Sequence, residues 1–302
     1  MSGFNKHFKD GTGGLRGGAN NATQGFRSAE RKITASNVWD DSIPVGYWDM
    51  SDGSGTEVSD VSSAGNNLDG TGYADVHSSP AWDSTNKVRG SYSLNFDKDD
   101  EDRVIVADDS ALDFNVDDEF SISCWIKKTS ADPSGETFAG LVSKMSQTAV
   151  TDSGDSAFDG YSFYMDASTQ QQPRFVLVVA SEVLRVAGGD ADEIADTDWH
   201  HLVVTYNGNA ALNGVKMYLD SAALSMSQVE DSLETDDDML TSADMSFGAF
   251  INNPNATPAS IFWHFHGNMD EIAIWDKELS SDEIDDLYNS GDGNDLTNGI
   301  PK

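Results

Sequence analysis

The sequence is poor in cysteine, basic residues and long apolar runs, and each scarcity excludes a kind of bond, partner or location. Cys124 is the only cysteine among 302 residues, so no disulfide can form within the chain. Lysine and arginine total 18 against 52 acidic residues, a net charge of -34. Such a chain repels nucleic acid, so we expect no nucleic-acid partner. No apolar run approaches the roughly 18 residues of a membrane span, so we expect no membrane insertion.

Residues 1–38 differ in charge from the rest of the chain. They hold six basic and two acidic residues, a net of +4, whereas the remainder holds 12 basic and 50 acidic residues, a net of -38. Glycines between positions 11 and 25 interrupt any regular element, so this segment cannot bury enough surface to fold alone. We predict an extended arm that docks on another protein, the alternative being a flexible leader. Its predicted anchors are Phe4, Phe8, Arg16, Phe26, Arg27 and Arg31.

Residues 39–302 carry about a dozen short apolar or alternating runs that turn residues separate, with aromatic residues inside them. Alternation with a period of two is typical of strands, and little helical periodicity occurs before residue 280. The sequence therefore predicts an all-β fold, a two-sheet antiparallel sandwich that follows the N-terminal arm.

The segment 265–291, FHGNMDEIAIWDKELSSDEIDDLYNSG, predicts a strand followed by one short C-terminal helix. Asp270 shares its parity with two isoleucines of the strand, so we expect it to face the core, where a carboxylate must be paired, hydrogen-bonded or metal-bound. Ser280 and Glu283 have the spacing of a capping box at the start of the helix. Gly291 stands where a C-terminal glycine cap belongs.

This segment resembles the closing motif of laminin G-like, concanavalin A-type jelly rolls, in which a G-x-hydrophobic-D-E-hydrophobic strand precedes a helix ending in L-Y. Further landmarks follow in the family's order between residues 44 and 291. They are 45–60, then Asn66, Asn67 and Gly70; 90–96; 103–107; 120–127; 199–206; and 216–220. Ser221, where the family usually has glycine, and the acid-rich stretch 230–238 depart from the pattern. The resemblance implies a jelly roll that serves recognition.

The resemblance also implies a structural calcium ion, which the family often holds between its first and last strands and the D-x-S-G loop. At the positions of this sequence that match the family's motifs, the implied calcium ligands are Asp60, Asn67 and Asp270. Oxygen ligands of these types suit a hard cation. The alternative is that Asp60 caps a turn and Asp270 accepts backbone N–H bonds.

Glycan binding is the common role that the resemblance implies. Sugar sites of this kind use an exposed aromatic residue, and Trp82 in the polar stretch SSPAWDSTN is the candidate; the alternative is that Trp82 closes one end of the sandwich. The fold also houses glucanases, but their E-x-D-x-x-E run is missing here. Asp270 and Glu271 are adjacent on a strand and should face opposite sides, unlike a catalytic pair. We therefore expect no enzyme.

An extracellular type of fold with one cysteine, and no apolar h-region at the N-terminus, predicts release by a route other than signal-directed export. We predict a virion surface protein, such as a phage capsid decoration, fibre or adhesin. Its arm would bind viral structural proteins, its sandwich would bind cell-surface glycans, and a homo-oligomer is compatible with this role. The alternatives are an extracellular, calcium-dependent bacterial lectin or adhesin and an atypical glycoside hydrolase.

Overall fold

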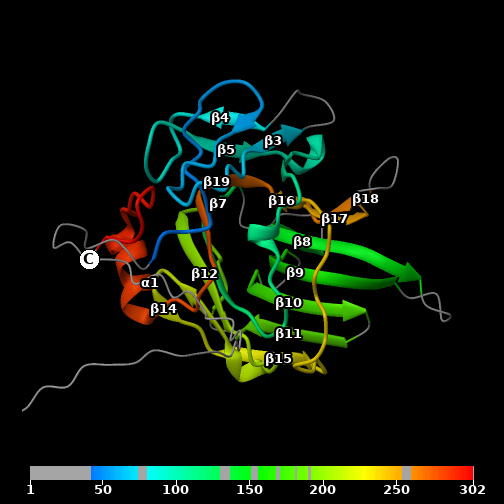
Figure 1. The fold of residues 1–302 in the computed structure, drawn as a ribbon. Helices are drawn as coiled ribbons and strands as arrows, with labels where there is room; N and C mark the ends of the chain where they lie inside the picture. The colour runs from blue at the N-terminus through cyan, green and yellow to red at the C-terminus, as the bar shows by residue number, and fades with distance from the viewer. Residues whose placement is uncertain are drawn as a thin grey trace, which may run out of the picture. The chain divides into compact units, whose positions relative to one another are not determined.

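The computed structural model describes residues 42–73, 80–129, 137–150, 156–167, 171–180, 182–189, 192–253 and 260–301. The predicted arm and its six anchor residues lie outside these ranges. Within them, strands dominate and form two antiparallel sheets that face each other across a shared core (Figure 1). The predicted all-β sandwich is confirmed. No helix in the described part of the chain has the length and apolarity that crossing a membrane requires.

Sheet A has the strand order β14-β13-β12-β7-β19-β5-β4, and β1 also pairs with β19. The central pair is β7 and β19, which come from predicted strand segments far apart in the sequence. The strands are β1 Gly46–Trp48, β4 Ala81–Asp83, β5 Ser93–Phe96, β7 Glu119–Lys128, β12 Trp199–Asn207, β13 Val215–Leu219, β14 Ala222–Ala223 and β19 Gly267–Trp275.

Sheet B has the order β15-β11-β10-β9-β8-β16-β6-β3-β2, and a separate hairpin, β17–β18, lies next to β8. The strands are β2 Glu57–Val58, β3 Gly70–Tyr73, β6 Arg103–Val106, β8 Phe138–Val150, β9 Ser156–Asp166, β10 Pro173–Ala180, β11 Glu182–Gly188, β15 Met226–Asp231, β16 Met245–Phe247, β17 Phe250–Asn253 and β18 Ser260–Phe262. Short 3-10 turns occupy Lys98–Asp100, Ser110–Leu112, Leu212–Gly214 and Asn289–Gly291.

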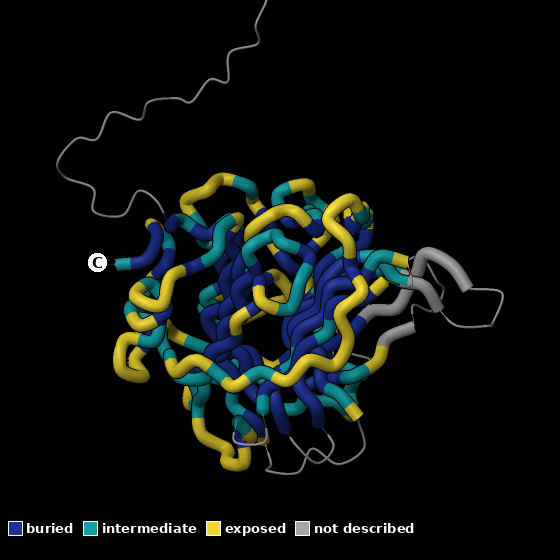
Figure 2. The backbone as a smooth tube through the Cα atoms, turned by 90° about the horizontal axis from the view of Figure 1, so that it is seen from below, coloured by how far each residue is buried: buried dark blue, intermediate teal, exposed yellow. Residues whose placement is uncertain are grey.

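The core between the sheets is rich in aromatic side chains. The ring of Phe120 stacks on Phe114 with centroids 4.7 Å apart, and Trp48 packs edge to face on Phe247 at 4.8 Å. Cys124 is fully buried among them, and burial raises the pKa of its thiol, so it remains a small apolar group. Figure 2 shows the buried segments at the centre of the molecule, with exposed segments around them.

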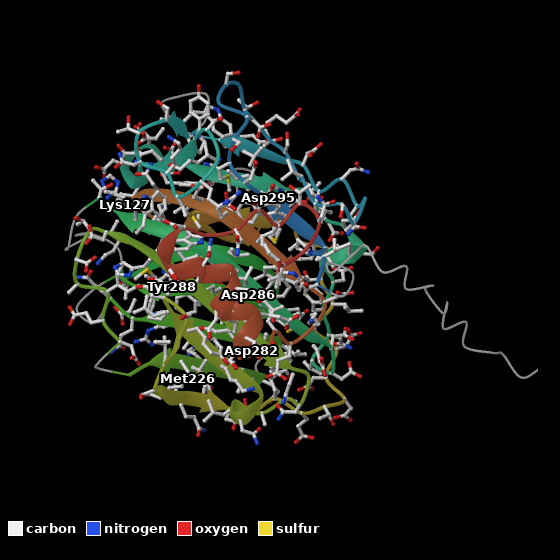
Figure 3. All side chains as sticks on the ribbon, turned by 90° about the vertical axis from the view of Figure 1, so that its left-hand side faces the viewer. Lys127, Met226, Asp282, Asp286, Tyr288 and Asp295 are labelled. Atoms are coloured by element: carbon white, nitrogen blue, oxygen red, sulfur yellow. The ribbon has the colours of Figure 1, made fainter. Side chains whose placement is uncertain are left out.

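Helix α1, Ser281–Tyr288, covers the outer face of sheet A, as Figure 3 shows. The predicted capping box is present: the Ser280 side chain accepts from the backbone N–H of Glu283, and the Glu283 carboxylate accepts from that of Ser280. Ile284 and Leu287 are buried in a second apolar cluster with residues of β19 and the C-terminal segment. The helix ends at Asn289 in the left-handed conformation, φ 47°, so the expectation of a cap at Gly291 was wrong. Asparagine tolerates this conformation, and the chain turns two residues earlier than expected.

Lys144 is buried on the face of β8 that points into the interior of the sandwich. The Lys144 ammonium donates to Asp108 Oδ1 at 2.5 Å, to the carbonyl of Ala243 at 2.7 Å and to that of Thr241 at 3.1 Å. Asp113 Oδ1 lies 3.1 Å from the same nitrogen. One buried cation therefore joins β8 to the loop that follows β6 and to the segment before β16.

Candidate functional site

Strands β8 to β11 have a second apolar face, on the side of sheet B away from the core. Along β10, Phe175 and Leu177 point into the core, whereas Val176 and Val178 point outward. The outward residues join Phe250 of the β17–β18 hairpin in a third apolar cluster. A groove of about 640 Å³ opens over this face. The described residues that line it are Phe138, Met145, Phe158, Tyr164, Arg174, Val176, Val178, Ala180, Val183, Arg185, Val229, Phe250, Phe262 and Trp263.

Trp263 organises the aromatic wall of this groove. Its ring centroid lies 4.8 Å from that of Phe138 and 4.8 Å from that of Phe250. It also stacks on Tyr164 at 5.7 Å, with an interplanar angle of 23°. The indole is half-buried, so part of it remains open to solvent. Flat rings that line an open groove can stack on the apolar face of a sugar ring or on another apolar ligand.

The backbone fixes this wall onto the sheet. The Gly140 N–H of β8 donates to the carbonyl of Trp263 at 2.6 Å. A Cβ at Gly140 would lie 2.6 Å from the carbonyl carbon of Ala249. Only glycine therefore lets the segment before β17 lie directly on β8, and this close approach positions Phe250 and Trp263.

Two arginines supply the charge in the groove. The Arg174 guanidinium donates to the buried Asp166 carboxylate at 2.7 Å and lies 5.6 Å over the Phe138 ring. Arg185 is the other charged residue of the lining, and its positive charge acts on the Tyr164 phenol. Burial raises the pKa of Tyr164 even though both arginines oppose the shift, so this phenol stays neutral at physiological pH.

Trp82 lies away from this groove, on β4 at the edge of sheet A. Its Nε1–H donates to the carbonyl of Gly55 at 3.0 Å, and its ring meets Tyr92 edge to face at 6.4 Å. The indole is half-buried against the main core. Glycan binding at Trp82 stays a prediction, and the packing resembles the closing role given as its alternative.

Sequence reasoning missed Trp263 because it lies in one of the short apolar runs that were interpreted only as strands. The signal that could have found the groove is in β10, whose run RFVLVVA is apolar at consecutive positions. A strand of this composition has both faces covered, so sheet B needed a second apolar layer. Nothing in this run indicates that the second layer leaves part of the sheet open.

The predicted calcium ligands are engaged in hydrogen bonds. Asp60 Oδ1 accepts from the N–H groups of residues 47 and 62, and its Oδ2 from that of residue 68, each at 3.0 Å. Asn67 is exposed, and its amide donates to Gly65. Asp270 accepts from the N–H groups of residues 88, 89 and 271. Within the described ranges no three His, Cys, Asp or Glu side chains gather as a metal site, and the carboxylates of Asp60 and Asp270 are occupied by backbone N–H donors. Calcium binding stays a prediction, and no function is derived through it.

Asp270 and Glu271 lie together at a bulge, and the expectation that they face opposite sides was wrong. The register of β19 shifts between residues 270 and 273, and Glu271 has a φ of 50°. The extra residue breaks the period of two, so Met269 and Ile272 face the core, while the two acids lie between them. Burial raises the pKa of Asp270 to about 7, and burial and the Asp270 charge raise that of Glu271.

Both acids are enclosed by protein. The Tyr47 hydroxyl donates to Glu271 Oε2, and Arg89 Nε lies 3.8 Å from its Oε1. Asp270 is fully buried and Glu271 is 3% exposed. Neither is among the described residues that line the groove on sheet B, so this pair does not flank that groove.

Comparison with known proteins identifies the family. The Concanavalin A-like lectin/glucanases superfamily matches residues 98–285, more than half of the chain. The chain therefore belongs to this superfamily, as its ordered motifs predicted, and forms a lectin-like jelly roll. A comparison with curated proteins gave no match.

Solved structures share the fold at low identity. The binding domain of Paraclostridial Mosquitocidal Protein 1 has a TM-score of 0.55 and 12% identity, over 82% of this chain and 52% of that one. The botulinum neurotoxin serotype C1 binding domain has a TM-score of 0.52 and 16% identity over the same shares. The chain thus spans about half the length of these toxin domains.

A third structure matches over nearly its whole length. Domain 4 of AbnA, a GH43 extracellular arabinanase from Geobacillus stearothermophilus, was solved in complex with arabinotriose. Its TM-score is 0.51 at 17% identity, over 82% of this chain and 98% of that domain. At these identities the likeness shows the fold alone.

Proposed function

We propose that this chain is a non-enzymatic carbohydrate-binding domain whose site is the groove on sheet B. The observation that carries the proposal is the wall of Trp263, Tyr164 and Phe138 beside two arginines, over an open apolar face. Sugar rings have apolar faces that stack on aromatic side chains and hydroxyl groups that bond to nearby polar groups.

Two further observations support this function. A domain of similar length and the same fold, from the arabinanase AbnA, was solved with arabinotriose. The adjacent acids Asp270 and Glu271 are buried and do not line the groove, and none of its described lining residues is a carboxylate, whereas glycoside hydrolysis needs two carboxylates that flank the bond. A binding role therefore agrees with the geometry better than hydrolysis does.

The test is a binding screen of the purified chain against neutral and acidic oligosaccharides by isothermal titration calorimetry. For any ligand found, we expect Trp263→Ala to weaken binding about tenfold or more, because the stacking surface is lost. Trp82→Ala is the matched control, since it removes a half-buried indole from β4, and it should leave binding unchanged. Loss of binding in Trp82→Ala alone would move the site to β4. Circular dichroism checks that both variants fold.

We further propose that the domain works on the surface of a virus particle, with residues 1–38 bound to viral structural proteins. This proposal is supported by the contrast between the net charge of +4 in residues 1–38 and -38 in the rest. Mass spectrometry of purified particles should find the chain; particles that contain every other structural protein and lack this one would exclude the role. A genomic neighbourhood of bacterial secretion genes would favour the alternative, a secreted bacterial lectin or adhesin.

A further inference from the structure

The polar side chains of the groove are almost all hydrogen-bond donors. Arg174, Arg185 and the Trp263 indole carry N–H groups and no acceptor. The Tyr164 hydroxyl is the one other polar side-chain group among the described lining residues. None of the described lining residues is a carboxylate, an amide or a small hydroxyl residue. Neutral sugars present hydroxyl groups that must both donate and accept, so this lining suits a ligand that brings strong acceptors of its own.

The sign of the charge in the groove is opposite to that of the whole chain. Acidic residues outnumber basic ones 52 to 18, yet both charged residues that line the groove are arginines. Each arginine has one carboxylate partner that is not among the described lining residues, Asp166 for Arg174 and Glu230 for Arg185, so the lining itself presents cationic donors that can attract an anionic group.

The arginines also have bonding capacity left for a ligand. Arg174 is held in place by Asp166, and its Nε–H is buried without a hydrogen-bond partner among the described residues. Arg185 has a side chain that is 36% exposed, and its ionic partner, Glu230 Oε2, lies at the long distance of 3.4 Å. An exposed pair of this kind contributes little, so a ligand carboxylate can replace Glu230 at small cost.

We propose that the groove binds a carboxylated glycan, one that contains uronic or sialic acid, through Arg185 and Arg174. The ligand carboxylate accepts from the guanidinium groups, while an adjoining ring stacks on Trp263. This inference rests on the proposed sugar-binding function and adds the class of sugar.

The experiment compares each acidic sugar with a neutral counterpart: galactotriose has hydroxymethyl groups where trigalacturonate has carboxylates, and lactose lacks the sialic acid residue of 3′-sialyllactose. Trigalacturonate is titrated against galactotriose, and 3′-sialyllactose against lactose, with oleate as a carboxylate that carries no sugar. We expect at least one acidic sugar to bind about tenfold or more tightly than its neutral counterpart. Equal binding within both pairs would overturn this inference and leave the proposed function intact. No binding of any sugar, or binding of oleate alone, would overturn both.

Two variants should change the affinity in opposite directions. Arg185→Gln should weaken binding of the acidic sugar about tenfold, whereas Glu230→Gln should strengthen it, because the competing carboxylate is removed. Arg103→Gln is the matched control: it removes the same charge from β6, where Arg103 lies 5.5 Å over the Tyr73 ring. An equal loss in Arg103→Gln and Arg185→Gln would show an effect of net charge only and would contradict the proposal. Arg174 is not substituted, because its loss would leave the buried Asp166 carboxylate without its ionic partner.

Discussion

Two buried ionisable residues, Asp270 and His201, change the free energy of unfolding in opposite directions as the pH rises. Asp270 has its pKa raised by burial to about 7 from 3.8, so between those values the folded state binds this proton more tightly than the unfolded chain. The free energy of unfolding that this group contributes therefore falls as the pH rises through that range. His201 behaves oppositely, since burial lowers its pKa to about 3 from 6.5, and its contribution rises with pH between those values. The two slopes partly cancel, so only a comparison of variants can separate them.

Glu271→Gln isolates the acidic pair. At pH 8 the variant should be more stable than the wild type by about 1–3 kcal/mol, because a buried carboxylate beside Asp270 is replaced by a neutral group that can still accept from Tyr47. Near pH 4 the difference should shrink, because Glu271, whose pKa burial raises, is then protonated. Urea unfolding at both pH values measures this. Glu230→Gln, at an exposed site, controls for the change in net charge. A variant that is less stable than the wild type at pH 8 would show Glu271 ionised and paired with Arg89.

At the scale of elements, the β17–β18 hairpin depends on one glycine of β8. Gly140→Ala should destabilise the protein by about 1–3 kcal/mol, because the new Cβ would meet the backbone of Ala249 and the hairpin would have to move. The same movement should weaken ligand binding, since Trp263 bonds to Gly140 through its carbonyl. Urea unfolding and calorimetric titration measure the two effects.

Gly188→Ala is the control for that prediction. A Cβ there would meet its nearest neighbours at 3.4 Å, an ordinary contact, so little change is expected. If both variants lose the same free energy of unfolding, the cause is a general sensitivity of sheet B to alanine. The close approach of Ala249 to Gly140 would then not explain the effect.

Elements with strong local signals were predicted from the sequence. The capping box at Ser280 and Glu283 fixes the start of α1 through contacts only three residues apart. The bulge at Asp270 and Glu271 was not predictable, because it depends on pairing with β7, which is remote in sequence. The position of Trp263 was missed for the same kind of reason, since it depends on Gly140 and on rings from β8 and β9.

At the scale of the whole molecule, the ordered motifs predicted the sandwich, because a jelly roll is specified by many weak patterns that agree. The groove was not predicted, because a strand that is apolar on both faces does not reveal which part of its second face stays open. The excess of acidic residues was evident from composition alone, and its consequence is self-repulsion in the folded state.

Added salt should therefore stabilise the molecule. Between about 10 mM and 500 mM sodium chloride the free energy of unfolding should rise by about 1 kcal/mol or more, and Tm by roughly 2–4 °C, because screening weakens repulsion among like charges. Differential scanning calorimetry measures Tm. Magnesium and calcium chloride at matched ionic strength are the comparison: a gain with calcium well above that with magnesium would support the predicted site at Asp60, Asn67 and Asp270. No rise with any salt would contradict the electrostatic argument.

The ammonium of Lys144 has two carboxylates and two carbonyl oxygens around it, which are oxygen ligands of the types that also bind metal ions. A cation that is covalently part of the chain cannot be extracted by a chelator or lost on dilution. The junction that it makes between β8, the loop after β6 and the segment before β16 is therefore independent of the supply of minerals in the surrounding medium.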